Sequence, residues 1–210
     1  MNEPLKQFEK ELPGLISSEE YVDGTLDLID ALLKDAGPEI LDAIPVAKSL
    51  HALYRAGNNI SDRYFLRKLA NFLLQLKQIP KYERDKYLDK IQHDQKERDK
   101  IGPTLIILLD RFDDLKKPEL LARVFEAFMR EEIDLETFRR MGSAIDKCFV
   151  SDLHKLENLS ASDELHPTTA ATFYSSGFTI LASVLPGDFS GGLTKFHITD
   201  FGKEFLRIIK

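Results

Sequence analysis

A change of sequence period near the C-terminus constrains this fold more than any other feature. Up to residue 160, apolar residues recur mainly with the spacing of helices. Residues 178–184 and 195–199 are instead short runs of β-forming residues, and the glycine-rich residues 186–192 between them indicate a hairpin loop. Asp200 is placed to cap a last helix over residues 201–209. The chain is therefore expected to end as helix, strand, loop, strand and helix.

Helical spacing dominates the preceding part of the chain. Gly37-Pro38, Ile79-Pro80 and Gly102-Pro103 predict breaks in a series of six to eight helices. Residues 105–109 are all apolar but too few to span a bilayer, so they predict a buried helix, with a strand as the alternative. We expect three regions, namely a polar tail over residues 1–22, an α-helical domain over 23–160 and a small module over 161–210. The polar tail would be either loose or a short helix.

Acidic charge is concentrated at the start of the chain, and no segment is strongly basic. The net charge is −6; residues 1–50 carry 11 acidic and 4 basic side chains, whereas residues 161–210 carry 5 acidic and 4 basic ones. Lys and Arg contacts with phosphates supply most of the affinity for nucleic acid, so this balance disfavours a C-terminal DNA site. Residues 77–100 interleave both signs, which is typical of a solvated helix.

The single cysteine and the polar N-terminus bear on the cellular compartment. Cys148 has no partner for a disulfide within the chain and no second thiol for a zinc site. The first residues lack the basic and then apolar layout of a secretory signal, and no run of 18 apolar residues occurs. We therefore expect a cytoplasmic protein.

The sequence contains no recognisable catalytic or metal-binding constellation. The five histidines lack metal-pair spacing, and neither a nucleophile elbow nor a phosphate loop is present. Two acidic clusters are explained by helix ends, where carboxylates cap backbone N–H groups. These clusters are Asp110, Asp113 and Asp114, and Glu131, Glu132, Asp134 and Glu136. Cys148 is expected to be a buried, inert thiol. We expect no cofactor, no metal and no enzyme activity.

One apolar helix face is expected beyond the second acidic cluster, and Asp134 is placed to cap that helix. Its side chains would be Phe138, Met141, Ile145, Phe149 and Leu153.

Two segments resemble known proteins. The turn 175–178 is similar to the one that follows a recognition-type helix, and residues 196–205 resemble the exit of many bacterial winged-helix proteins. Residues 168–210 thus look like a winged-helix end, which implies a mainly α fold: a multi-helix bundle followed by a small winged-helix-like β-hairpin. Residues 44–156 resemble uncharacterised helical proteins carried by bacteria, prophages and mobile elements. That resemblance implies a role in defence or element maintenance and brings no catalytic residues.

These observations favour a non-enzymatic protein that interacts with a protein partner or with itself. Its recognition surface would be the wing and the preceding helix, because aromatic residues dominate binding energy at interfaces. The expected contact residues are Phe173, Tyr174, Phe189, Leu193 and Lys195.

Two alternative functions remain open at this point. A winged-helix DNA-binding regulator would use Arg63, Arg67 and Lys68, although residues 166–174, where a DNA reader carries Arg or Lys, contain neither. A protein associated with a membrane surface would use residues 44–57, which are rich in small residues and weakly charged.

Overall fold

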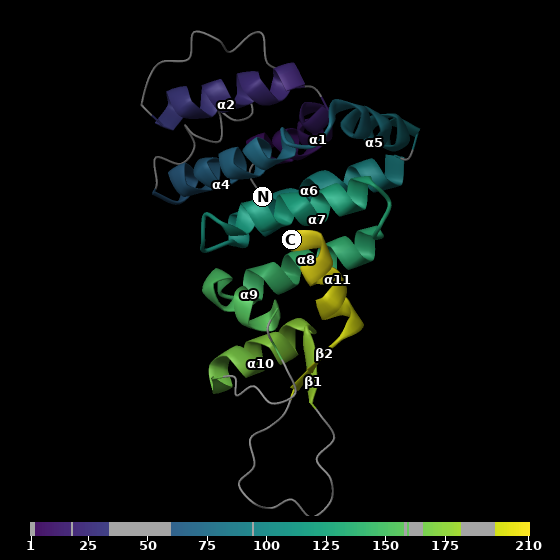
Figure 1. Ribbon diagram of the computed structural model, residues 1–210. Coiled ribbons are helices and arrows are strands. Elements are labelled where there is room, and N and C mark those ends of the chain that lie inside the picture. The colour runs from purple at the N-terminus through teal and green to yellow at the C-terminus, as the bar shows by residue number, and fades with distance from the viewer. Residues whose placement is uncertain are drawn as a thin grey trace, which may run out of the picture. The chain divides into compact units, whose positions relative to one another are not determined.

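The computed structural model is mainly helical, with a small antiparallel sheet of two strands near the C-terminus (Figure 1). It describes residues 3–17, 19–33, 60–93, 95–157, 159, 166–181 and 196–210. The expected fold class is thereby confirmed. The predictions for residues 34–59, for the linker near 160–163 and for the hairpin loop lie outside the described residues.

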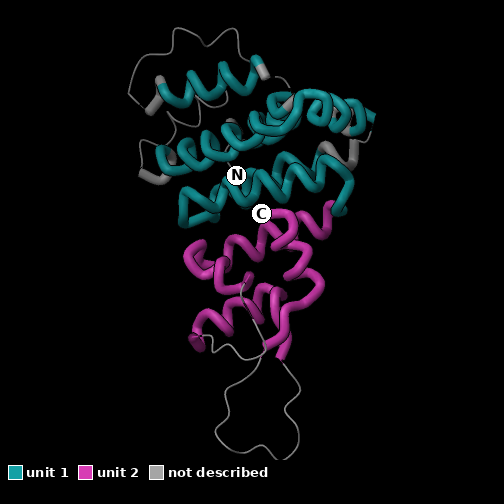
Figure 2. The backbone as a smooth tube through the Cα atoms, viewed as in Figure 1, with its two compact units in different colours: residues 1–134 teal, residues 135–210 magenta. Residues whose placement is uncertain are grey.

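The chain divides into two compact units, residues 1–134 and 135–210 (Figure 2). The expected boundary at residue 160 differs from this division, because the helices between residues 135 and 157 contact the helix over residues 167–176. In the first unit the described helices are α1 (Glu3–Ser17), α2 (Glu19–Leu33), α4 (Ile60–Leu76), α5 (Lys81–His93), α6 (Gln95–Arg111) and α7 (Lys117–Met129).

Apolar stripes on facing helices build the core of the first unit. Helix α4 packs against α7, α6 and α2, and α1 packs against α6, α5 and α2. An aromatic cluster joins three of these helices: Phe72 of α4 lies 5.9 Å from Phe125 of α7, and Tyr87 of α5 lies 5.7 Å from Phe125, between ring centroids. Edge-to-face contacts of this kind add to the free energy of burial.

Of the two expectations for the N-terminal residues, a loose tail or a short helix, the structure shows a helix over residues 3–17, and this helix has a buried face. Phe8, Leu12, Leu15 and Ile16 are at most 2% exposed. Their spacing of three and four residues places them on one side of α1, against α6 and α5. Charged residues on the rest of the helix make this segment polar on average, so its composition did not predict the apolar stripe.

The break predicted at Gly102-Pro103 is also wrong, since α6 continues through both residues. A Cβ at Gly102 would overlap the backbone carbonyl of Glu9, so this glycine permits close approach of α1 and α6 rather than ending a helix. Proline removes one hydrogen bond of the helix. Burial of Ile101 and Leu105 on either side offsets that cost.

In the described part of the second unit, three helices precede two strands and a final helix. Its elements are α8 (Leu135–Lys147), α9 (Val150–Glu157), α10 (Pro167–Ser176), β1 (Thr179–Leu181), β2 (Phe196–Ile198) and α11 (Asp200–Ile209). The strands pair antiparallel, with Thr179 opposite Ile198 and Ile180 opposite His197. The predicted order of helix, strand, strand and helix is confirmed.

Phe178 is the centre of the core beneath the hairpin. Its ring lies 4.5 Å from that of Phe205 and 5.7 Å from that of Phe201, and both contacts are stacked. Phe173 of α10 meets it edge-on at 6.4 Å. Because these rings come from α10, α11 and the residue before β1, a single side chain fixes the hairpin between two helices.

Thr199, and not Asp200 as predicted, caps α11. Its hydroxyl accepts a hydrogen bond from the N–H of Gly202 at 3.0 Å and donates one to the carbonyl of Gly177 at 2.8 Å. Asp200 instead forms an exposed ion pair with Lys203 inside the first turn. The threonine therefore links the start of α11 to the end of α10.

Candidate interaction surface

Helix α10 is held in place at both of its ends. It begins at Pro167, a residue suited to the first turn of a helix, and ends at Gly177, whose φ of 84° is readily adopted only by glycine. The hydroxyl of Thr169 donates to the Asp152 carboxylate of α9 at 2.9 Å. The α10 face that remains outside the core is therefore presented by a fixed helix.

Asp152 is the electrostatic anchor of that arrangement. Lys155 bonds to its carboxylate at 2.6 Å, and this hydrogen bond, followed by the one from Thr169, holds the pKa of Asp152 below its ordinary value of 3.8 despite partial burial. The charged form of Asp152 is thus the form that ties α9 to α10.

The exposed side of α10 carries no charge. Thr169, Ala170 and Phe173 face the core, whereas Thr168, Ala171, Tyr174 and Ser175 are exposed. Tyr174 is the large side chain among the exposed ones, at 52%. Residues 167–181 contain neither an acidic nor a basic side chain, in a chain of which 30% is charged.

Strand β1 extends this uncharged region. Ile180 is 53% exposed and Leu181 48%, while Thr179 is buried. Successive residues of a strand point to opposite faces, so Ile180 lies on the outer face together with its exposed cross-strand neighbour His197. We call Thr168, Ala171, Tyr174, Ser175, Ile180 and Leu181 the neutral surface.

The corner between α8 and α9 adjoins the end of α10. Lys147 donates to the carbonyl of Ser175 at 3.3 Å, and the Cys148 thiol contacts the Ser176 hydroxyl at 3.8 Å. Phe149, the next residue, is 65% exposed. The prediction that Phe149 continues an apolar helix face is wrong, because α8 ends at Lys147 and α9 starts afresh at Val150.

The predicted contact residues meet different outcomes. Phe173 is fully buried, so its expected role as an exposed contact residue is wrong; its position on α10 points to the core beside Phe178. Tyr174 is exposed as expected. Phe189, Leu193 and Lys195 lie outside the described residues. The sequence did not predict that Ile180 is exposed, because its apolar side chain follows the buried polar Thr179, the reverse of the usual alternation of apolar core and polar surface residues.

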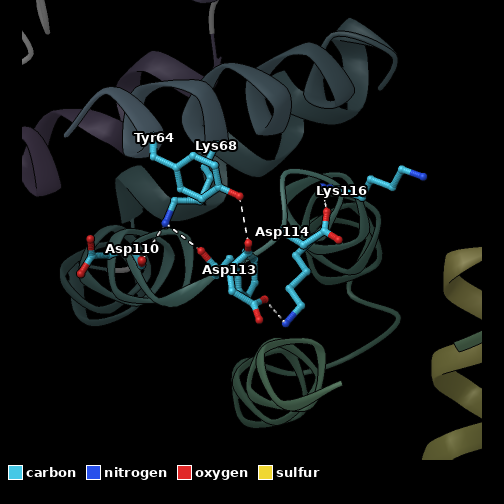
Figure 3. A network of polar contacts seen from close by, with 8 residues as sticks. Tyr64, Lys68, Asp110, Asp113, Asp114 and Lys116 are labelled. Atoms are coloured by element: carbon cyan, nitrogen blue, oxygen red, sulfur yellow. Dashed lines mark hydrogen bonds and ion pairs between the residues drawn. The ribbon is translucent and has the colours of Figure 1, made fainter. Parts of the chain in front are cut away.

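The residues proposed for DNA binding belong to a different environment in the first unit. Tyr64 and Lys68, one turn apart on α4, donate to backbone carbonyls of residues 110–113 (Figure 3). Asn71, three residues further on, donates to the carbonyl of Leu115 at 2.8 Å. The Lys68 ammonium bonds to the carbonyl oxygens of Asp110 at 2.7 Å and Phe112 at 3.0 Å. These contacts satisfy carbonyl groups that the end of α6 leaves without helical partners.

Lys68 is therefore a structural residue, and its predicted role in DNA binding is wrong. It is 3% exposed, and its ammonium also lies 5.3 Å from the centre of the Tyr64 ring. Arg63 and Arg67 remain exposed on α4. Two basic side chains make a weak electrostatic footprint for a duplex.

Lys117 reinforces the same turn. This lysine is 1% exposed and pairs with the Asp113 carboxylate at 2.6 Å, and that hydrogen bond holds the pKa of Asp113 below 3.8. Asp114 accepts from the backbone N–H of Lys116 at 2.8 Å. The first acidic cluster thus serves the connection between α6 and α7, as the interpretation from helix ends predicts.

Ion pairs also account for much of the charged helix α5. Glu83 binds Arg130 through two hydrogen bonds, and the pKa of Glu83 is lowered by Arg130. Lys90 lies 3.7 Å from the carboxylate of Glu131, a residue of the second acidic cluster. Charged side chains of α5 therefore form ion pairs with opposite charges at the end of α7. Part of the charged surface of α5 is thus a contact between helices and is not only solvated.

The described residues were also compared with the arrangements that metal binding, a reactive thiol and a membrane span require. There, no group of three or more His, Cys, Asp or Glu side chains is arranged to hold a metal ion. Cys148 is buried at 1% exposure, as expected. None of the described helices is long and apolar enough to cross a membrane.

Comparison of this chain with protein-family models, with curated proteins and with solved structures finds no match.

Proposed function

We propose that this protein acts by binding another protein surface through the neutral surface of α10 and β1, without catalysing a reaction. The observation that carries the proposal is the exposure of Tyr174, Ile180 and Leu181 on a stretch of 15 residues without charge. Ile180 and Leu181 lie on opposite faces of β1, so each face of this strand exposes one large apolar side chain. Contiguous exposed apolar surface marks interaction sites more often than singly scattered side chains do.

The surface also fits the anatomy of protein interfaces. Interface centres are depleted in charge and enriched in aromatic residues, and Tyr174 supplies a rigid aromatic anchor with a polar tip. Fixed support lowers the entropy that binding must offset, and α10 is tied to α9 through Thr169 and Asp152. The Ser175 hydroxyl donates to the carbonyl of Thr172 at 3.1 Å and keeps its lone pairs to accept a hydrogen bond from a partner.

The test is affinity capture with the tagged chain and matched variants. Tyr174→Ala and Ile180→Lys should reduce the recovered partner at least about tenfold, the loss expected when an interface anchor is removed or a charge is buried against an apolar surface. Leu74→Lys is the control, because Leu74 is comparably exposed at 48% but lies on α4. Equal recovery with all three variants would refute the neutral surface as the binding site.

A DNA-binding regulator is the competing function. With Lys68 engaged in the fold, it would depend on Arg63 and Arg67, and binding would weaken steeply with salt. A duplex titration at low salt measures this directly. A shift that Arg63→Ala and Arg67→Ala abolish would replace our proposal with the regulator.

A further inference from the structure

We draw no further inference here: the strongest candidate, the patch of exposed side chains that Tyr174, Ile180 and Leu181 form on α10 and β1, belongs to the surface already described, and nothing among the described residues shows which partner covers it.

Discussion

Replacement of Lys68 by methionine tests the structural role that this residue has in place of DNA binding. Methionine keeps most of the apolar stem but removes the ammonium, leaving the carbonyl oxygens of Asp110 and Phe112 without that donor. Each hydrogen bond to a charged donor contributes about 1.5–3 kcal/mol. The positive charge near the end of α6 adds about 0.3–1 kcal/mol through the helix dipole. Relief from burying an ammonium, which is 3% exposed as part of Lys68, offsets part of this loss.

The expected net destabilisation is about 2–4 kcal/mol. For a chain of this size that corresponds to a fall in melting temperature of roughly 4–15 °C. Urea unfolding followed by circular dichroism measures the difference, with Arg67→Met as the control. Arg67 is the exposed neighbour on the same helix, and its replacement should change stability by less than about 0.5 kcal/mol. Equal stability of Lys68→Met and wild type would refute the role assigned to these hydrogen bonds.

Three further predictions concern the supports of the fold. Gly102→Ala should lower the free energy of unfolding by at least about 1–3 kcal/mol, because the new Cβ meets the Glu9 carbonyl. Gly14→Ala, whose Cβ would have nothing within 4 Å, should be neutral or stabilising. Thermal melting of both variants checks this contrast, and equal melting temperatures would contradict it. Thr199→Ala should lower the free energy of unfolding by about 1–3 kcal/mol, because it removes the α11 cap and the hydrogen bond to Gly177. Thr199→Ser keeps the hydroxyl and should retain most of that stability in urea unfolding. A serine variant as unstable as the alanine variant would contradict the role assigned to the hydroxyl. The folded-state pKa of Asp152 lies below its ordinary value of 3.8, so its contribution to stability is present above about pH 4 and is lost as pH falls through the lowered pKa. Between pH 6 and pH 3, Asp152→Asn should therefore lose less stability to unfolding than wild type. Equal losses of stability in both proteins would contradict this assignment.

The sequence predicted those parts of the fold whose signals are local. The runs of β-forming residues and the change of period after α10 indicated the two strands, and the apolar spacing of α4 and α7 indicated two central helices. Gly102 and Pro103 led to the wrong prediction of a break because glycine and proline commonly occur at helix ends. Here the close approach of α1 and the burial of Ile101 outweigh the local preference, and contacts with a helix some 90 residues earlier in the chain are not encoded in a short window.

The candidate surface was predictable in composition but not in orientation. The absence of charge from residues 167–181 is visible in the sequence. Which aromatic side chain faces outward depends on how α10 is rotated against Phe178, so Phe173 and Tyr174 could not be separated by residue type. The burial of Lys68 could not be predicted from its residue type either. Its spacing with Tyr64 and Asn71 does place the three polar side chains on one side of α4.

Hydrogen–deuterium exchange of the protein alone and in the complex it forms tests the central claim most directly. Binding through the neutral surface predicts slower exchange for amides of residues 168–181 in the complex, with the amides of α4 unchanged, because association covers the former and leaves the environment of the latter as it was. The same result is expected whether the partner is a second copy or another protein. Slower exchange in α4 or elsewhere, with residues 168–181 unaffected, would contradict the claim.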